Sequence, residues 1–122
     1  MSPVVLAVIE QEGRWFLQRR DPASPVMPGL WEFPGGKVEP EESLRSALLR
    51  ELQEEIAVSV VALEAWGVGD GDPVLHLFRV RILGRPVTPL AWGWFTPAEL
   101  LRLPLPPRNL ALIQRLASGE GR

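Results

Sequence analysis

The chain has 122 residues, of which 46% are hydrophobic, a size and composition that suit one domain with a buried core spanning residues 1–122. Its formal net charge of −2 argues against a nucleic-acid polymer as partner, and the lack of cysteine excludes disulfides, thiolate nucleophiles and thiolate metal sites. No apolar run approaches the roughly 18 residues that a membrane helix needs, and the apolar start lacks a basic leader, so we expect a soluble cytoplasmic protein with no membrane partner.

The first third of the sequence predicts a hairpin, a loop and a short extended segment. In chain order we expect a strand at 4–9, a turn at 11–13, a strand at 14–19, a loop at 21–29 and an extended segment at 31–33. The loop holds three prolines and a glycine. The extended segment precedes Pro34, which disfavours a helix in the residue before it.

Two features then lead into a helix. Gly35-Gly36-Lys37 permits a close approach of backbone to a phosphate or metal, and adds the only lysine of the chain. The helix dipole explains the acids Glu39, Glu41 and Glu42, because it favours negative charge at a helix N-terminus by about 0.3–1 kcal/mol.

Residues 42–56 form the clearest predicted helix, with 15 residues and no glycine or proline. Its apolar stripe, at i, i+4 spacing, consists of Leu44, Leu48, Leu52 and Ile56. Glu51, Glu54 and Glu55 share another face, and Glu55 falls close to the apolar stripe. Like charges at this spacing destabilise a helix by about 0.2–0.5 kcal/mol per pair, a cost that a bound hard cation such as Mg²⁺ would offset. Arg50 could hold one carboxylate by a bidentate bond; the alternative is a solvated acidic face with Arg50 as ordinary surface charge.

The second half of the chain predicts three strands and two further helices. We expect strands at 58–66, 74–83 and 91–95, turns or loops at 67–73 and 84–89, a short helix at 97–101, a proline break at 104–107 and a final helix at 109–117. Thr96 should cap the short helix, with Pro97 at its first position. The whole predicts one α+β domain, a mixed sheet with a central helix and a C-terminal helix packed on it.

The segment from Gly36 to Val58 resembles the Nudix box, G-x5-E-x7-R-E-U-x-E-E-x-G-U, in which U is a bulky apolar residue. Eight of the nine fixed positions match. The departure is Ala57, where a glycine would let the chain turn left-handed after the helix. Alanine at positive φ costs on the order of 1 kcal/mol, so we expect the helix to end differently or with mild strain.

The resemblance implies the Nudix fold, a mixed sheet sandwiched between helices (α/β/α), in an enzyme that hydrolyses a phosphoanhydride bond of a nucleoside diphosphate derivative. It implies Mg²⁺, with Mn²⁺ as an alternative, as the cofactor. The implied metal ligands are Gly35, Glu51, Glu54 and Glu55, and the implied catalytic residues are Glu51, Arg50 and Glu54, with Arg50 orienting a box glutamate.

Looser likeness outside the box, at residues 19–20, 29–37 and 106–109, resembles the MutT type. That type cleans the nucleotide pool by releasing a nucleoside monophosphate and pyrophosphate from oxidised deoxynucleoside triphosphates. The implied substrate-binding residues are Arg20, Glu32, Phe33, Pro34, Gly35, Gly36, Lys37 and Asn109. The rival interpretations are a plain exposed strand end for Arg20, core for Phe33 and an N-cap for Asn109, which the likeness assigns to the base edge. The expected partner is a small nucleotide, bound by a monomer or homodimer.

One feature of the MutT type is missing, because residues 84–94 contain no Asp or Glu in the loop that usually carries a further acid. The general base would then be a box glutamate such as Glu51, or Asp70, Asp72 or Glu64. Two alternative functions stay open: a Nudix hydrolase for a pyrimidine triphosphate, a dinucleoside polyphosphate or ADP-ribose, and a Nudix-fold binding module without catalysis. His76 is expected to be a packed histidine, and the tryptophans at 31, 66, 92 and 94 are mainly core candidates.

Overall fold

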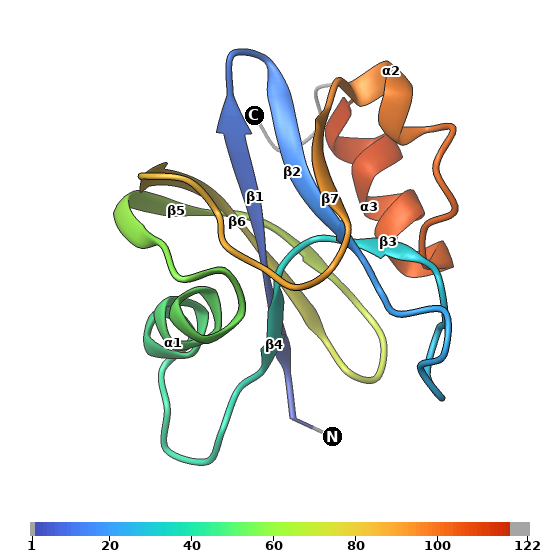
Figure 1. Cartoon of the computed structure of the whole chain (residues 1–122). Coiled ribbons are helices and arrows are strands. Elements are labelled where there is room, and N and C mark those ends of the chain that lie inside the picture. Colours follow the sequence, from blue (N-terminus) through green and yellow to red (C-terminus); the bar gives the residue numbers. More distant parts are fainter. Residues whose placement is uncertain (1, 118–122) are drawn as a thin grey trace.

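The structure, a computed structural model, describes residues 2–117, and every strand and helix expected from the sequence is present within them. Figure 1 shows one sheet system with helices on two sides. The elements are β1 (Val4–Gln11), β2 (Arg14–Arg19), β3 (Trp31–Glu32), β4 (Gly35–Lys37), α1 (Leu44–Ile56), β5 (Ser59–Gly69), β6 (Leu75–Leu83), β7 (Trp92–Phe95), α2 (Pro97–Leu100) and α3 (Pro107–Ala117). No described helix is both long and apolar enough to cross a membrane.

The sheet is mixed, as predicted. Its main path runs β3-β2-β1-β6-β5, with β4 paired to β1 and β7 paired to β2. β1 and β6 are parallel, with Val4 opposite Leu75 and Ile9 opposite Val80. The other pairings are antiparallel. β1 is therefore a central strand, with β6 on one side and β4 and β2 on the other.

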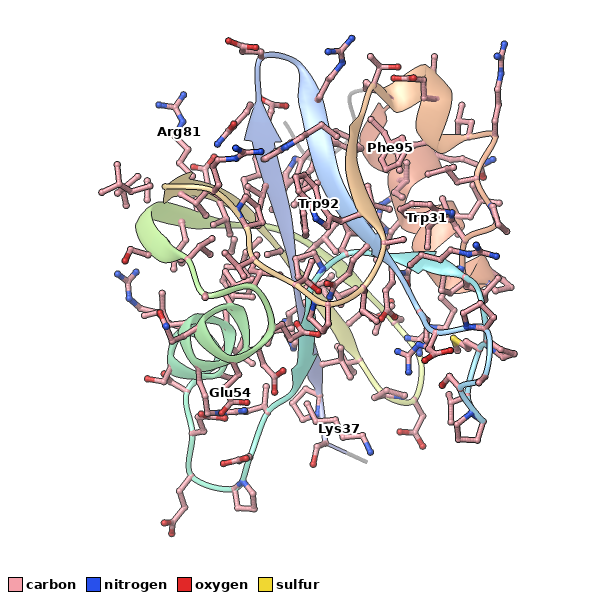
Figure 2. The ribbon with its side chains drawn as sticks, viewed as in Figure 1. Trp31, Lys37, Glu54, Arg81, Trp92 and Phe95 are labelled. Atoms are coloured by element: carbon pink, nitrogen blue, oxygen red, sulfur yellow. The ribbon has the colours of Figure 1, made fainter. Side chains whose placement is uncertain are left out.

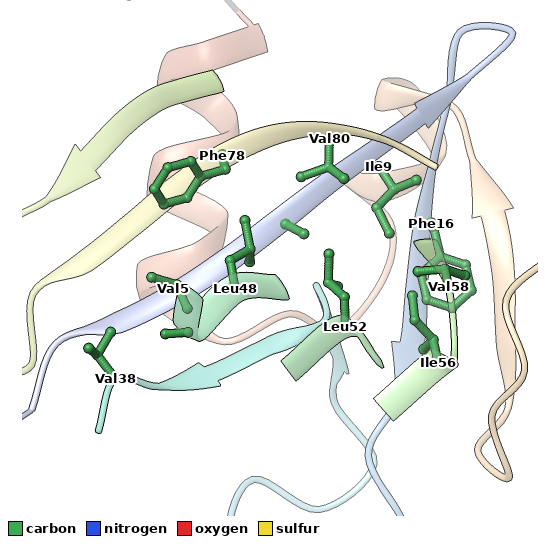
Figure 3. Close-up of a cluster of buried hydrophobic side chains, with 12 residues drawn as sticks. Val5, Ile9, Phe16, Val38, Leu48, Leu52, Ile56, Val58, Phe78 and Val80 are labelled. Atoms are coloured by element: carbon green, nitrogen blue, oxygen red, sulfur yellow. The ribbon is translucent and has the colours of Figure 1, made fainter. Parts of the chain in front are cut away.

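Alternation along β1 supplies both faces of the core, because successive side chains in a strand point to opposite faces. Val5, Ala7 and Ile9 pack against α1. Figure 3 shows that cluster, in which the α1 residues Leu48, Leu52 and Ile56 meet the sheet. On the opposite face, Leu6 and Val8 join a second cluster with α2 and α3. The expected sandwich of a mixed sheet between helices is confirmed.

The tryptophans predicted as core all pack on these clusters. Trp92 and Trp94 lie partly buried against the α1-side cluster, and Trp31 and Trp66 against the other. Trp31 meets Phe95 edge-on at 5.1 Å between ring centroids.

Several bounds differ from the prediction. β1 extends to Gln11 and β5 to Gly69, so both strands enter residues that were expected to form turns. α1 begins two residues later than expected, at Leu44, because the Ser43 side chain accepts the backbone N–H of Ser46 and caps the helix. α3 begins two residues earlier, at Pro107, because proline is well suited to the first helical position. Gly35–Lys37 was expected only as tight backbone, and it forms a strand against the start of β1.

Of the two endings expected for α1, a different path or mild strain at Ala57, the structure shows the strained one. Ala57 adopts the left-handed conformation, with φ 54° and ψ 43°, that the box glycine would take without a side chain. The backbone path of the motif is thus kept, at the cost of an alanine in a disfavoured region.

Candidate active site

Arg50 organises the acidic face of α1. Its Nε and Nη2 donate to the two carboxylate oxygens of Glu42, at 2.8 and 3.0 Å, and its Nη1 donates to Glu51 at 2.8 Å. Nη2 also donates to the backbone carbonyl of Lys37 at 3.1 Å. One guanidinium therefore ties the loop before α1, the helix itself and the end of β4 together, in the bidentate manner expected of Arg50.

Glu42 precedes α1 rather than opening it as predicted, and beside the helix dipole it has a specific partner in Arg50. The Arg50 guanidinium, helped by the backbone N–H of Glu39, holds the pKa of Glu42 at about 2. This carboxylate stays ionised at physiological pH and serves as an anchor for Arg50.

Glu55 lies deeper, where α1 meets β4. Its Oε2 accepts the backbone N–H of Gly35 at 2.8 Å, and its Oε1 accepts the side-chain amide of Gln18 at 3.4 Å. Burial raises the pKa of Glu55 to about 7, against the lowering effect of the Gly35 N–H; the negative charges of Glu51 and Glu32 raise it further.

Glu51 packs against the glycine pair. A Cβ on Gly36 would stand 2.6–2.8 Å from the carboxylate atoms of Glu51, so only glycine leaves room for that carboxylate beside β4. Glu54, by contrast, has a side chain that is 61% exposed and touches Arg50 at 3.5 Å. Figure 2 shows Glu54 projecting from α1, while Lys37 leaves the end of β4 on the side of the N-terminal segment.

The three box carboxylates share a helix face, but they have different partners. Among residues 2–117 no three acidic or histidine side chains gather closely enough to hold a metal ion in this conformation. The donor set nevertheless fits a hard divalent cation, since it consists of carboxylate and carbonyl oxygens. The space that Gly36 leaves around Glu51 is a cradle that a Cβ would fill.

A pocket of about 300 Å³ opens beside these carboxylates. It is lined by Gln18, Glu54, Glu55, Thr88, Pro89 and Leu90. Gln18 is only 1% exposed, and its carbonyl oxygen accepts the hydroxyl of Thr88 at 3.1 Å. The sequence analysis did not single out this pair. Its one signal is a polar side chain two positions after Phe16, on the core-facing side of a strand buried on both faces.

Five of the eight residues implied to bind substrate fall into two groups. Gly35, Gly36 and Lys37 line the seam between β4 and α1, as described above. Arg20, which directly follows β2, pairs with Glu32 of β3 at 2.7 Å, and the Nε of Arg20 is buried without a hydrogen-bond partner in the described part of the chain. An ordinary exposed strand end is thus the wrong interpretation of Arg20.

Phe33 and Asn109 lie on the α3 side of the sheet. Phe33 is buried in the cluster there, 6.3 Å from the ring of Trp15, so its core role is confirmed. Asn109 lies in the first turn of α3, two residues after its start, so the N-cap interpretation is wrong. It is 8% exposed, and no hydrogen bond to its side-chain amide is present within the described residues. A buried amide of this kind has hydrogen-bonding capacity to spare.

The acids considered as alternative bases lie elsewhere. Glu64 lines a different pocket, of about 410 Å³, together with Glu10 and Arg79. Asp70 follows β5, and Arg108 of α3 donates to its carbonyl oxygen at 3.1 Å. Figure 1 shows the turn between β5 and β6 and helix α1 on opposite sides of β4.

Comparisons with known proteins assign the chain to a family. The model of the NUDIX domain matches residues 2–116. A CTP pyrophosphohydrolase from Escherichia coli (strain K12) is 36% identical over 93% of this chain and 90% of its own length. A putative 8-oxo-dGTP diphosphatase 2 from Mycobacterium tuberculosis (strain H37Rv) is 35% identical over 96% of this chain and 89% of its own. A MutT structure, from work on Aliivibrio salmonicida and Vibrio cholerae, superposes with a TM-score of 0.82 at 27% identity over 96% of both chains.

Proposed function

This chain belongs to the Nudix family and is a hydrolase of phosphoanhydride bonds, and from that premise we propose that it is a Mg²⁺-dependent nucleoside triphosphate pyrophosphohydrolase of the MutT type. It would convert a nucleoside triphosphate, in first place an oxidised deoxynucleotide, into the monophosphate and pyrophosphate. Such an activity removes damaged precursors before they enter DNA.

The observation that carries the proposal is the fixed acidic face of α1. Arg50 holds Glu42 and Glu51, while the Gly35 N–H holds Glu55. A non-catalytic module would need no such arrangement of like charges, which is costly unless a cation offsets it. Nudix hydrolases generally use a divalent metal, and the carboxylates here suit Mg²⁺, with Mn²⁺ as a substitute.

The residues of the candidate site have different proposed roles in hydrolysis. Glu51, Glu54, Glu55 and the Gly35 carbonyl would hold the metal, which when bound polarises phosphate oxygens and lowers the pKa of water. Arg50 keeps Glu51 in place, and Arg20 and Lys37 are the cations proposed to contact phosphate. Glu51 and Glu54 are the two candidates for deprotonating the attacking water. Single Gln substitutions assayed at saturating Mg²⁺ separate them, because the base is the residue whose loss lowers kcat most once the weaker metal binding is overcome.

Asn109 supports the choice of an oxidised purine. Its amide can donate to and accept from a base edge, and no described residue occupies it. A second candidate is a cytidine triphosphate, because a relative of 36% identity carries the name CTP pyrophosphohydrolase. The two differ in the ring that must be recognised, while the triphosphate chemistry is the same.

A comparison of substrates tests the proposal. We would measure kcat/KM with Mg²⁺ for 8-oxo-dGTP, dGTP, CTP and dCTP, in the wild type and in Asn109→Ala. The proposal expects the highest kcat/KM for 8-oxo-dGTP. Asn109→Ala should lower that kcat/KM by about 5–150-fold, the range that corresponds to a lost base contact of about 1–3 kcal/mol. If CTP instead has the highest kcat/KM, and Asn109→Ala leaves that value unchanged, the second candidate replaces the first.

A further inference from the structure

A chain of hydrogen bonds runs from the β6–β7 loop to the carboxylate of Glu55. The backbone N–H of Leu90 donates to the Thr88 hydroxyl at 3.1 Å. That hydroxyl donates to the Gln18 carbonyl oxygen at 3.1 Å, and the Gln18 amide nitrogen donates to Glu55 at 3.4 Å. Every link joins a donor to an acceptor, so the chain has one direction.

The Gln18 amide meets each neighbour with the matching group. The Thr88 hydroxyl accepts the Leu90 N–H and donates its single proton to the Gln18 carbonyl oxygen. The Gln18 NH₂ group faces Glu55 and donates to its carboxylate.

The loop that carries Thr88 is itself held at two points. The backbone N–H of Val87 donates to the carbonyl of Ile56 at the end of α1, at 2.8 Å. The carbonyl of Ala91 accepts the N–H of Arg19 in β2, at 2.8 Å. Thr88 therefore stands between two backbone anchors, one on the helix of Glu55 and one on the strand of Gln18.

The place of Gln18 is unusual for a polar side chain. It is 1% exposed, on the same strand face as Phe16, which lies in the α1-side core. Burying an amide is costly unless its hydrogen bonds are made, and here both ends of the amide have partners. The loop at residues 84–91 has no acid, so a neutral donor rather than a second carboxylate faces Glu55.

We propose that Gln18, oriented by Thr88, is a positioning residue that holds the Glu55 carboxylate between β2 and the Gly35 N–H. It would reach the reaction through Glu55 and would not itself touch the substrate. The catalytic part of this proposal rests on the proposed function. The structural part, the hold on Glu55, can be measured without any turnover.

The test compares three near-isosteric substitutions. Gln18→Met removes the amide, and Thr88→Val removes the hydroxyl that orients it. Thr96→Val is the matched control, since it removes a threonine hydroxyl that caps α2 away from the site. Thermal unfolding establishes that each variant is folded. We would then record the Gly35 amide resonance and its hydrogen exchange, without metal, because that N–H reports on Glu55 directly.

The proposal expects the Gly35 amide to shift and to exchange faster in Gln18→Met and Thr88→Val, but not in Thr96→Val. In turnover it expects kcat to fall about tenfold with KM for the nucleotide nearly unchanged, as for other residues that orient metal ligands. The double variant should lose no more of kcat than Gln18→Met alone, because the two residues act through the same chain of hydrogen bonds.

An unchanged Gly35 amide in folded Gln18→Met would overturn the proposal, and so would additive losses in the double variant. A wild type without turnover of any nucleotide would contradict the proposed function. In that case a shifted Gly35 amide resonance would still show that Gln18 positions Glu55. Failure of the proposed function and failure of the positioning role are therefore distinguishable.

Discussion

Glu55 and Gly35, 20 positions apart in the sequence, are joined by a hydrogen bond of 2.8 Å from the Gly35 backbone N–H to the Glu55 carboxylate. This bond joins the start of β4 to the last turn of α1 and brings the glycine pair to the acidic face of the helix. It also turns the Gly35 peptide into part of the candidate site.

Arg50→Lys should lower activity by about 10–100-fold, the usual effect of losing a residue that orients metal ligands. A lysine carries the charge but cannot bridge Glu42 bidentately while also reaching Glu51. Steady-state kinetics measure the loss. Arg45→Lys is the matched control, because Arg45 is exposed on the same helix. Equal activity of the two variants would show that the Arg50 network is dispensable.

Gly36→Ala should abolish most of the activity while leaving the protein folded. The new Cβ would press on the end of the flexible Glu51 side chain, at 2.6–2.8 Å, so that the carboxylate moves and the backbone stays. Circular dichroism and turnover are measured together. In Gly93→Ala the Cβ would meet the ring of Phe95 in β7, so a similar crowding there should spare activity.

Ala57→Gly should stabilise the protein by about 0.5–1 kcal/mol. Ala57 has φ 54°, a region that glycine enters without the steric cost that alanine carries. The free energy of unfolding in urea measures the gain. Ala62→Gly, in strand β5, should instead destabilise by a similar amount, because a strand interior does not need positive φ. A destabilised Ala57→Gly would mean that the left-handed ending carries no strain.

The stability of the metal-free protein should fall as the pH rises from about 4.5 to about 7. Burial raises the pKa of Glu55 to about 7 from its ordinary 4.5, so in this window the folded chain keeps a proton that the unfolded chain has lost. The slope for one proton is about 1.4 kcal/mol per pH unit, or on the order of 3 kcal/mol across the window. Glu55→Gln should lack this contribution. Parallel stability curves for the two proteins in EDTA would contradict it.

Local patterns in the sequence predict much of this fold. The i, i+4 stripe of Leu48, Leu52 and Ile56 predicts the buried face of α1, and all three are fully buried. Thr96 and Pro97 predict the start of α2, which the structure confirms as a capping box. Such signals work because cap and stripe act within a few residues of the chain.

Long-range contacts account for what the sequence did not predict. Gly35–Lys37 becomes a strand only because β1 lies beside it. Glu42 was assigned to the helix dipole, since nothing local indicated that Arg50 would reach back eight residues to bind it. The link of Gln18 to Thr88 spans 70 residues, and no periodicity within either segment points to it.

The most direct test of the central claim is the product of hydrolysis and its dependence on metal and on one carboxylate. Purified protein would be incubated with 8-oxo-dGTP and CTP, with Mg²⁺ or with EDTA, and the products followed by ³¹P NMR. Glu55→Gln is the test variant, and Glu12→Gln, an exposed glutamate in the β1–β2 turn, is its control.

We predict that the wild type and Glu12→Gln release a nucleoside monophosphate and pyrophosphate only with Mg²⁺, and that Glu55→Gln loses nearly all of this activity. Release of a nucleoside diphosphate and inorganic phosphate would contradict the pyrophosphohydrolase assignment. Full activity in EDTA, or in Glu55→Gln, would contradict the role given to the acidic face of α1.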